Sequence, residues 1–279
     1  MAKRKSNLNY VKIIKEKRGI GVGKKYITGI KIQDFPSVGR VTRANGKKTK
    51  RQQNFLSDLE RDYSKYLNFA DNVVDVREQF PLLPLEETLI IAKELGLEHP
   101  KSPKTKEPIV MTTDFLITCK DENSEVVEIA RTLKYKKDLL DKRVLEKFEI
   151  ERQYFVKRGI DWGIVTEEEI NKSVSNFIAD LYTYQNLSEI ESFQQIEAEI
   201  IEDMKLSFIN QCASYEGTLN SLCYNFDKTM NISIGSGIAM FKHLLVSKKI
   251  SVNIFDKIDF NEHVDITINK FKDRESTII

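Results

Sequence analysis

The segment Ile109-Val-Met-Thr-Thr-Asp-Phe-Leu-Ile-Thr-Cys119 decides the fold together with the segment that follows it, Glu125-Val-Val-Glu-Ile-Ala-Arg-Thr-Leu133. Both are rich in β-branched residues, which favour strands, and the polar turn Lys120-Asp-Glu-Asn123 separates them. We therefore predict a β-hairpin. Asp114 lies inside the first strand among apolar neighbours, where a carboxylate needs a cation or hydrogen-bond donors to offset its desolvation.

The regions on either side of the hairpin predict an α/β fold with a mixed sheet flanked by helices. Apolar residues at spacings of three and four are typical of amphipathic helices, and short apolar runs between turn residues are typical of strands. The expected elements, in chain order, are a helix over Gln52–Leu67, a strand over Val73–Phe80, a helix over Glu86–Leu95 ended by Gly96, the hairpin, a helix over Leu139–Lys157 and a strand over Asp161–Val165. This core spans about 165 residues.

After Thr166 the sequence becomes helical. Thr166-Glu-Glu-Glu169 carries the hydroxyl and the carboxylate of a capping box, which predicts a helix that begins at Glu167. The expected elements are helices over Glu167–Leu181, Leu187–Ala213 with a break, Thr218–Phe226 and Gly235–His243, then strands over Ser251–Phe255 and Val264–Ile268. We therefore expect a first domain over residues 1–166 and a helical, winged-helix-like domain over residues 167–279.

Composition excludes several classes of protein. The chain has 279 residues, of which 41% are hydrophobic and 31% charged, so it folds around real cores rather than remaining disordered. We expect no membrane segment and a cytoplasmic location, because no apolar run reaches about 18 residues and the first residues lack an apolar signal core. The three cysteines, Cys119, Cys212 and Cys223, show no CxxC spacing and favour neither a disulfide framework nor a zinc site.

Charge is distributed unevenly along the chain. Residues 1–51 contain 16 Lys or Arg and two acidic residues, a net charge of +14, so residues 52–279 carry −12 of the total of +2. A polycation of this kind binds nucleic acid by displacing counterions from the phosphate backbone. Interleaved apolar residues suggest that the segment is a folded arm rather than a solvated tail. The expected DNA-binding residues are Lys24, Lys25, Arg40 and Arg43.

Three residues of the first domain predict phosphodiester chemistry. Glu60 lies on the first predicted helix, Asp114 on the hairpin's first strand and Lys134 at the end of its second strand. A nuclease can use the carboxylates to hold a divalent cation and the lysine to orient the attacking water. Because the chain has 42 acidic and 44 basic residues, such a trio also arises by chance, and a purely structural role for Asp114 stays open.

Longer strings of sequence carry a family resemblance. The chain resembles TnsA-type endonucleases, the restriction-enzyme-like subunits of heteromeric transposases, with few gaps from about residue 15 to residue 170. The last hundred residues or so are similar only in length and helical character. The strings that carry the resemblance are Gly19–Tyr26, Ser37-Val-Gly-Arg40, Leu56-Ser-Asp-Leu-Glu60, Val74–Pro84, His99-Pro100, Met111-Thr-Thr-Asp-Phe-Leu116, Leu145-Glu-Lys147 and Glu151-Arg152.

The resemblance implies a reaction and a set of partners. It implies a PD-(D/E)xK nuclease core with Glu60, Asp114 and Lys134 as catalytic residues and two Mg²⁺ ions, for which Mn²⁺ can substitute. Double-stranded DNA at transposon ends would be cut on its 5′ strands, leaving 3′-hydroxyl and 5′-phosphate ends. A DDE-type, TnsB-like transposase would cut and join the 3′ strands, and a TnsC-like regulator ATPase would contact the second domain.

One position departs from the family pattern. The motif has Asp, Glu or Gln two residues before the lysine, whereas this chain has Thr132 there, and a hydroxyl is a poorer magnesium ligand than a carboxylate or an amide oxygen. The expected metal ligands are therefore Glu60, Asp114, Thr132 and the carbonyl of Leu133. Two further interpretations remain open: a DNA-binding assembly subunit that is catalytically weakened, and an autonomous restriction endonuclease.

Overall fold

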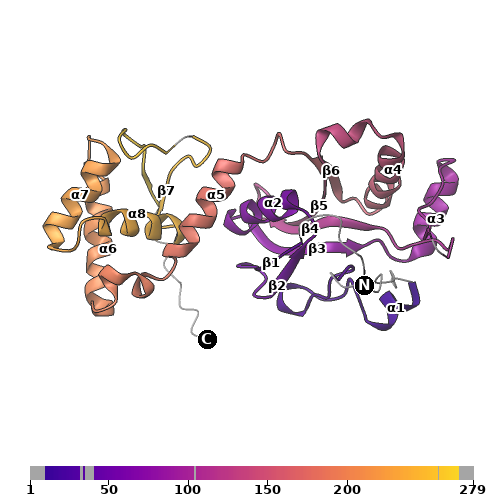
Figure 1. Ribbon diagram of the computed structural model, residues 1–279, viewed down its shortest axis with the longest axis horizontal. Coiled ribbons are helices and arrows are strands. Elements are labelled where there is room, and N and C mark those ends of the chain that lie inside the picture. Colours follow the sequence, from indigo (N-terminus) through magenta and orange to yellow (C-terminus); the bar gives the residue numbers. More distant parts are fainter. Residues whose placement is uncertain (1–9, 32–33, 35–40, 104, 257, 270–279) are drawn as a thin grey trace, which may run out of the picture. The chain divides into compact units, whose positions relative to one another are not determined.

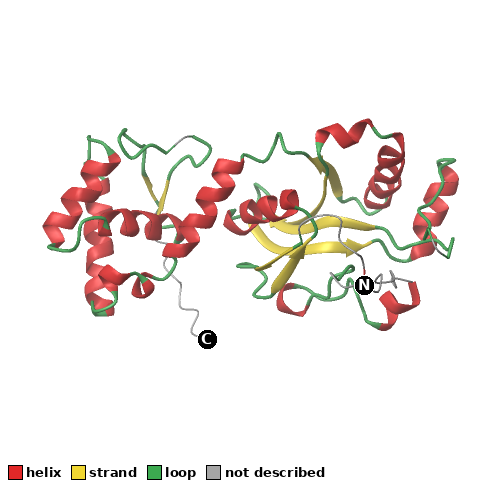
Figure 2. Cartoon of the chain, viewed as in Figure 1, coloured by secondary structure: helices red, strands yellow, loops and turns green. Residues whose placement is uncertain are grey.

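The computed structural model describes residues 10–31, 34, 41–103, 105–256 and 258–269 and separates into two units, residues 1–172 and 173–279. Strands lie mainly in the first unit and helices make up most of the second (Figure 1, Figure 2). The mixed α/β first unit and the helical second unit confirm the predicted fold class. Within the described ranges, every helix is too short or too polar to span a bilayer.

A four-stranded mixed sheet is the centre of the first unit. Its strands are β3 (Val73–Pro81), β4 (Thr112–Lys120), β5 (Val126–Leu133) and β6 (Asp161–Val165), in that spatial order. Strand β4 pairs antiparallel with β3 and with β5, whereas β6 runs parallel to β5. The predicted hairpin is confirmed as β4 and β5, and it forms the middle of the sheet.

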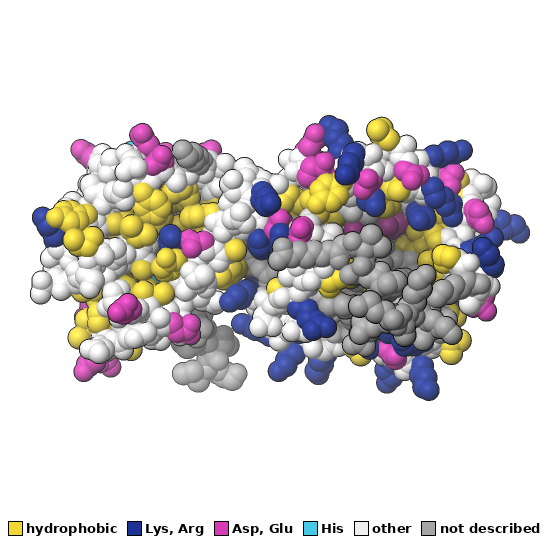
Figure 3. All heavy atoms as spheres, in the orientation of Figure 1, with side chains coloured by type: hydrophobic (Ala, Val, Ile, Leu, Met, Phe, Trp, Pro, Cys, Tyr) yellow, Lys and Arg dark blue, Asp and Glu magenta, His cyan; other side chains and the backbone are white. Residues whose placement is uncertain are grey.

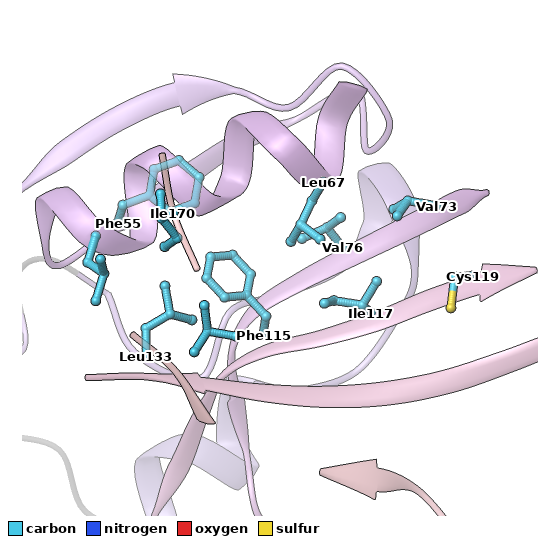
Figure 4. Close-up of a cluster of buried hydrophobic side chains, with 11 residues drawn as sticks. Phe55, Leu67, Val73, Val76, Phe115, Ile117, Cys119, Leu133 and Ile170 are labelled. Carbon is cyan, nitrogen blue, oxygen red and sulfur yellow. The ribbon is translucent and has the colours of Figure 1, made fainter. Parts of the chain in front are cut away.

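Helix α2 (Asp58–Phe69) covers one face of this sheet. Phe115 and Ile117 of β4 point to this face because side chains alternate along a strand. Figure 4 shows the Phe115 ring directed toward α2, where it lies near Leu67 of the helix and Val76 of β3. Burial of a Phe side chain stabilises a fold by about 1.5–3 kcal/mol, so this core fixes the helix over the sheet.

Helices α3 (Leu85–Glu94) and α4 (Lys142–Val156) cover the opposite face of the sheet (Figure 1). There Leu116 of β4 and Ala130 of β5 are buried against side chains of both helices. The helix predicted from Leu139 begins later than expected because residues 136–140 form a 3-10 turn, η3 (Lys136–Leu140), instead of its first turn.

The prediction of a single helix over Gln52–Leu67 is wrong for its first residues. Residues 52–55 form strand β2 (Gln52–Phe55), which pairs antiparallel with β1 (Thr42–Asn45). Alternate side chains of β2 are buried, which is the period of a strand rather than of a helix. Helix α2 begins only after Ser57, whose Oγ accepts the N–H of Glu60 at 3.1 Å as an N-cap.

The described part of the basic N-terminal segment is folded against the sheet. It contains helix α1 (Tyr10–Lys15) and the 3-10 turn η1 (Gly23–Lys25). Arg18 is buried and forms an ion pair with buried Asp34. The main chain continues the contact with β3, since the N–H of Gly29 donates to the carbonyl of Gln79 at 3.0 Å. The expectation of a folded arm is therefore confirmed for these residues.

The second unit is built from helices followed by a short ribbon. Its elements are α5 (Lys172–Leu181), η4 (Tyr182–Tyr184), η5 (Leu187–Glu189), η6 (Glu191–Phe193), α6 (Ala198–Cys212), α7 (Leu219–Met230), α8 (Ser236–Val246), β7 (Ile250–Ser251) and β8 (Thr267–Ile268). The two strands pair antiparallel, over a shorter length than the sequence predicted. A winged-helix relationship for this unit stays a prediction.

The first helix of this region begins later than the capping-box pattern predicted. The Thr166 hydroxyl and main-chain N–H both donate to Glu169, at 2.6 and 2.7 Å, so the pattern is present but closes a turn. Ile170 then packs into the core beneath α2. This burial holds residues 166–171 on the first unit, and helix α5 starts only at Lys172.

A buried carboxylate at the start of α8 generates a stability prediction. Asp227 of α7 accepts the N–H groups of Gly235 at 2.7 Å and Gly237 at 2.5 Å. An Asp227→Ala substitution leaves both donors, of which that of Gly237 is buried, without this partner, and we expect it to lower the free energy of unfolding by about 2–3 kcal/mol. Urea unfolding followed by circular dichroism measures this loss.

The matched control for this substitution is Asp203→Ala, which removes an exposed aspartate from α6. We expect the control to change the free energy of unfolding by less than about 0.5 kcal/mol. Equal losses in the two variants would show that Asp227 does not stabilise the α7–α8 junction.

Candidate active site

Two predicted site carboxylates meet at the end of the central hairpin. Glu60 comes from the first turn of α2 and Asp114 from β4, and the side chain of Gln79 on β3 lies between them. The Gln79 amide nitrogen donates to Glu60 Oε2 at 3.1 Å and to Asp114 Oδ1 at 3.2 Å. The main-chain N–H of Leu133 donates to Asp114 Oδ2 at 2.7 Å. Four elements, α2, β3, β4 and β5, therefore converge on one point.

Local structure explains how these groups are aimed. Glu60 is the carboxylate of a capping box, and its Oε2 and Oε1 accept the N–H of Leu56 and the hydroxyl of Ser57, both at 2.9 Å. Strands β4 and β5 remain paired up to Phe115 and Arg131. Beyond that pair, the N–H of β5 that would continue the ladder turns to the Asp114 carboxylate instead.

Burial makes this carboxylate pair electrostatically costly. Burial, and after it the negative charge of Asp114, raises the pKa of Glu60 to about 8. Burial also raises the pKa of Asp114 to about 6, although the Leu133 N–H, the Gln79 amide and the Lys134 charge act in the opposite direction. Two facing carboxylates in a desolvated site favour the binding of a cation, which would allow both to ionise.

Lys134 lies beside this pair rather than within it. Its main-chain N–H donates to the carbonyl of Val165 at 3.0 Å, which anchors it at the end of β5. Its ammonium group lies 3.8 Å from Asp138 Oδ2, and about a third of its side chain is exposed. The lysine is thus close enough to lower the pKa of Asp114 and has solvent access from which to meet a substrate.

Thr132, the departure from the family motif, is buried in a second polar cluster. Its hydroxyl lies 3.1 Å from that of Thr113 and donates to Glu151 Oε1, which also accepts the indole N–H of Trp162 at 2.9 Å. Burial, opposed by these hydrogen bonds, raises the pKa of Glu151 to about 7. The threonine therefore connects the candidate site to a third buried carboxylate.

Comparison with known proteins gives matches to two family models and to a transposition protein. Residues 70–167 match the family described as TnsA-like endonuclease N terminal, and residues 169–254 match TnsA endonuclease C terminal. The chain is also 35% identical over 279 residues to the transposon Tn7 transposition protein TnsA of Escherichia coli, an alignment that covers 99% of this chain and 97% of that protein.

The chain belongs to the TnsA endonuclease family. The resemblance noted in the sequence is therefore confirmed, and it extends into the C-terminal residues, where the strings alone showed little. Membership identifies the chain as a DNA endonuclease that acts in transposition. In this TnsA-family chain the matched N-terminal region contains Asp114, Thr132, Leu133 and Lys134, whereas Glu60 precedes it.

The donor atoms of the site suit a hard divalent cation. Carboxylate, carbonyl and hydroxyl oxygens are the ligands that Mg²⁺ prefers. The Arg131 carbonyl accepts a hydrogen bond from Thr113 Oγ1 of β4 at 3.4 Å. Carbonyl groups two residues apart on a strand point to the same side, so the Leu133 carbonyl also faces β4. Among the described residues, no three His, Cys, Asp or Glu side chains surround a common point, so further ligands must come from the main chain, a hydroxyl or water.

Sequence reasoning missed Gln79 and Glu151. Gln79 adopts a left-handed backbone conformation, with φ of 49°, which breaks the strand alternation and turns its amide to the carboxylates. Glu151 follows Val144 and Phe148 at helical spacings of seven and three, so it occupies the inward face of α4. For Glu151, the available signal was a charged residue on the inward face of a predicted helix. Both Gln79 and Glu151 also lie within the strings that carry the family resemblance.

The predicted DNA-binding residues are separated by the structure. Lys24 of η1 and Arg43 of β1 line one cavity together, whereas Lys25 is exposed and does not line it. Arg40 lies outside the described residues. Their role in DNA binding stays a prediction.

The raised pKa values predict how stability depends on pH without metal. Because the folded chain holds protons on Glu60, Asp114 and Glu151 that the unfolded chain releases near pH 4, we expect stability to fall as pH rises from about 4.5 to about 8. The slope is limited to about 1.4 kcal/mol per pH unit for each such proton. Thermal unfolding in EDTA across this range measures it.

Two glutamate variants test whether the Glu60 carboxylate causes this dependence of stability on pH. Glu60→Gln should flatten it, because the amide does not titrate, whereas Glu122→Gln in the exposed hairpin turn should leave it unchanged. An unaltered slope in the Glu60 variant would refute the assignment to this carboxylate.

Proposed function

We propose that this TnsA-family chain is a Mg²⁺-dependent endonuclease that cuts the 5′ strands at transposon ends. The observation that carries the proposal is the meeting of two buried carboxylates, Glu60 and Asp114, beside the end of a strand that continues into Lys134. Burial of each carboxylate carries a desolvation cost that a bound divalent cation would offset. Family membership supports the endonuclease activity itself.

In this proposal each residue has a distinct role. Glu60, Asp114, the Leu133 carbonyl and the Thr132 hydroxyl hold up to two Mg²⁺ ions, for which Mn²⁺ substitutes. The bound cation supplies Lewis-acid chemistry, since it offsets charge on the phosphate and lowers the pKa of water. The Lys134 ammonium, partly exposed at the strand end, orients the attacking water and stabilises the negative charge that builds on the phosphate oxygens.

Glu151 has a positioning role in the proposal. It accepts hydrogen bonds from Thr132 and from Trp162, and the first of these directs the threonine hydrogen away from the site. The oxygen of a hydroxyl that donates in one direction keeps its lone pairs for a cation or water on the other side. The pair Thr132 and Glu151 therefore replaces, in part, the longer oxygen ligand of the family motif.

The proposal includes partners. A DDE-type, TnsB-like transposase cuts and joins the 3′ strands, and a TnsC-like regulator ATPase binds the second unit. The relative in Escherichia coli is named as a Tn7 transposition protein, which supports action within such a complex. The acidic balance after the arm, −12 over residues 52–279, favours a protein rather than DNA as the main contact of the C-terminal region. Action on intracellular DNA fits a cytoplasmic location.

Strand-resolved cleavage tests the nuclease function. A transposon-end duplex labelled on either strand is incubated with Mg²⁺ and the partner transposase. We expect Lys134→Ala to lower the rate of 5′-strand cutting by about 10²–10³-fold, because it removes a charge that stabilises the transition state. The control, Lys136→Ala, removes a neighbouring exposed lysine that pairs with Glu168 and should cut normally.

The same assay separates the other interpretations. Equal cutting by the two lysine variants would refute the assigned role of Lys134. Sequence-specific cutting by the chain without any partner would favour an autonomous restriction endonuclease.

The threonine position favours a second candidate function, a catalytically weakened assembly subunit. If Thr132 limits metal binding, Thr132→Gln should lower the Mg²⁺ concentration for half-maximal cutting by about tenfold, and Thr132→Val should raise it. Titrations of Mg²⁺ in the cleavage assay measure both. Cutting by Thr132→Gln alone, with none by the unchanged chain, would establish the assembly role instead.

A further inference from the structure

A cationic cavity of about 350 Å³ lies between the N-terminal arm and the β1–β2 hairpin. Four of its lining side chains are positively charged, and none of the described residues that line it is acidic. On the face drawn in Figure 3, Lys and Arg side chains gather over the first unit. We call this cavity the arm pocket. Its four cations are Lys24, Lys31, Arg43 and Arg51.

Two of these cations are already neutralised. Arg51 forms a two-point ion pair with buried Glu78, in which Nη1 lies 2.6 Å from Oε1, and Lys31 lies 2.7 Å from Glu16. Within the described ranges, Lys24 and Arg43 form no ion pair, and both are exposed. The cavity therefore keeps about two positive charges that can neutralise an anion from solvent.

The wall of the cavity is held rigidly. The Arg51 guanidinium stacks over the Tyr26 ring at 4.8 Å and donates through Nε to the Gly23 carbonyl at 3.1 Å. The Tyr26 hydroxyl donates to the Glu78 carbonyl at 3.1 Å. An anion that enters meets a preformed site, so less ordering opposes its binding.

The cavity adjoins the carboxylate pair through two strands. On β3, Glu78 holds Arg51 in the cavity wall, and the next residue, Gln79, donates to both site carboxylates. On β2 and its continuation, Asn54 lines the cavity, and two residues later the N–H of Leu56 donates to Glu60. Two residues of extended chain span about 7 Å at ~3.3 Å each.

This spacing corresponds to about two phosphate steps along one strand of a nucleic-acid backbone. One DNA strand carries a phosphate for each ~3.4 Å of helix axis. A strand whose scissile phosphate lies at Glu60 and Asp114 therefore carries a phosphate about two steps away toward the cavity. Arginine and lysine are complementary in such a site, because arginine donates two parallel hydrogen bonds to phosphate oxygens and lysine acts as a point charge.

We propose that the arm pocket binds a backbone phosphate of the DNA strand close to the phosphate that is cut, with Lys24 and Arg43 as its binding groups. The proposal rests on the nuclease function proposed above and assigns a specific place on the chain to the substrate. Arg51 and Tyr26 form the wall, and contact with the backbone alone makes the site independent of base sequence.

Equilibrium DNA binding tests the pocket. The full chain is titrated against a fluorescent transposon-end duplex in EDTA at several salt concentrations. We expect Lys24→Ala/Arg43→Ala to bind about tenfold more weakly at low salt, with the slope of log K against log salt reduced by about 1–2, because each lost phosphate contact releases fewer counterions.

The matched controls for charge are Lys142→Ala, an exposed lysine on α4, and the double variant Lys142→Ala/Arg152→Ala on the same helix. They should keep the affinity and the slope of the unchanged chain. Arm pocket variants that bind like these controls would overturn the proposal, as would a lack of DNA binding by the unchanged chain at low salt.

Neutral methylphosphonates locate the contact. Each duplex carries one methylphosphonate at a defined distance from the cut position. At one position within a few nucleotides, we expect the substitution to weaken binding by the unchanged chain but not by Lys24→Ala/Arg43→Ala. If the methylphosphonate weakens DNA binding by the double variant as much as by the unchanged chain at every position, the proposed contact is overturned.

Two further arms distinguish the sources of failure. Saturable binding of inorganic phosphate that the double variant loses, with DNA binding retained, would make the pocket a free-anion site and overturn the DNA assignment. If Lys24→Ala/Arg43→Ala binds DNA and cuts the 5′ strand like the unchanged chain, the arm pocket proposal is overturned and the nuclease function stands. Absent cutting with a pocket-dependent methylphosphonate effect counts against the nuclease function alone.

Discussion

The desolvated pair of Glu60 and Asp114 is the constraint on which the first unit depends. Two carboxylates that face one another in a buried site repel, so the chain must surround them with donors. It does so with the amide of Gln79 and the main-chain N–H of Leu133. These donors come from β3 and from β5, on opposite sides of β4, which explains why the sheet has to be complete before the site exists.

Strand β3 positions the basic arm as well as the carboxylate pair. Glu78 and Gln79 are adjacent on β3, yet the first holds Arg51 beside the arm and the second holds the carboxylates. The left-handed backbone of Gln79 turns its side chain out of the regular alternation. Because the basic arm is tied to β3 at this point, its positive charge is held beside the negative pair, which is the arrangement that a phosphodiester backbone requires.

Much of the candidate site could be predicted from the sequence, and the reason is local. Asp114 is recognisable because a carboxylate in an apolar strand needs compensation, and Glu60 is expected on a helix; the capping box that places Glu60 in the first turn is seen only in the structure. Glu151 and Gln79 could not be assigned in the same way. The first depends on how α4 packs on the sheet, and the second on one unusual main-chain angle.

The sequence by itself determined the strands of the hairpin, the helices that flank them and the family, because alternation, capping and ordered strings are properties of nearby residues. Tertiary structure alone decided that residues 52–55 pair as a strand with β1, and that residues 166–171 stay on the first unit instead of starting a helix. It also decided that Lys24 and Arg43 share a cavity while Lys25 does not. These outcomes depend on burial against residues far away in the chain, a free energy that no local pattern contains.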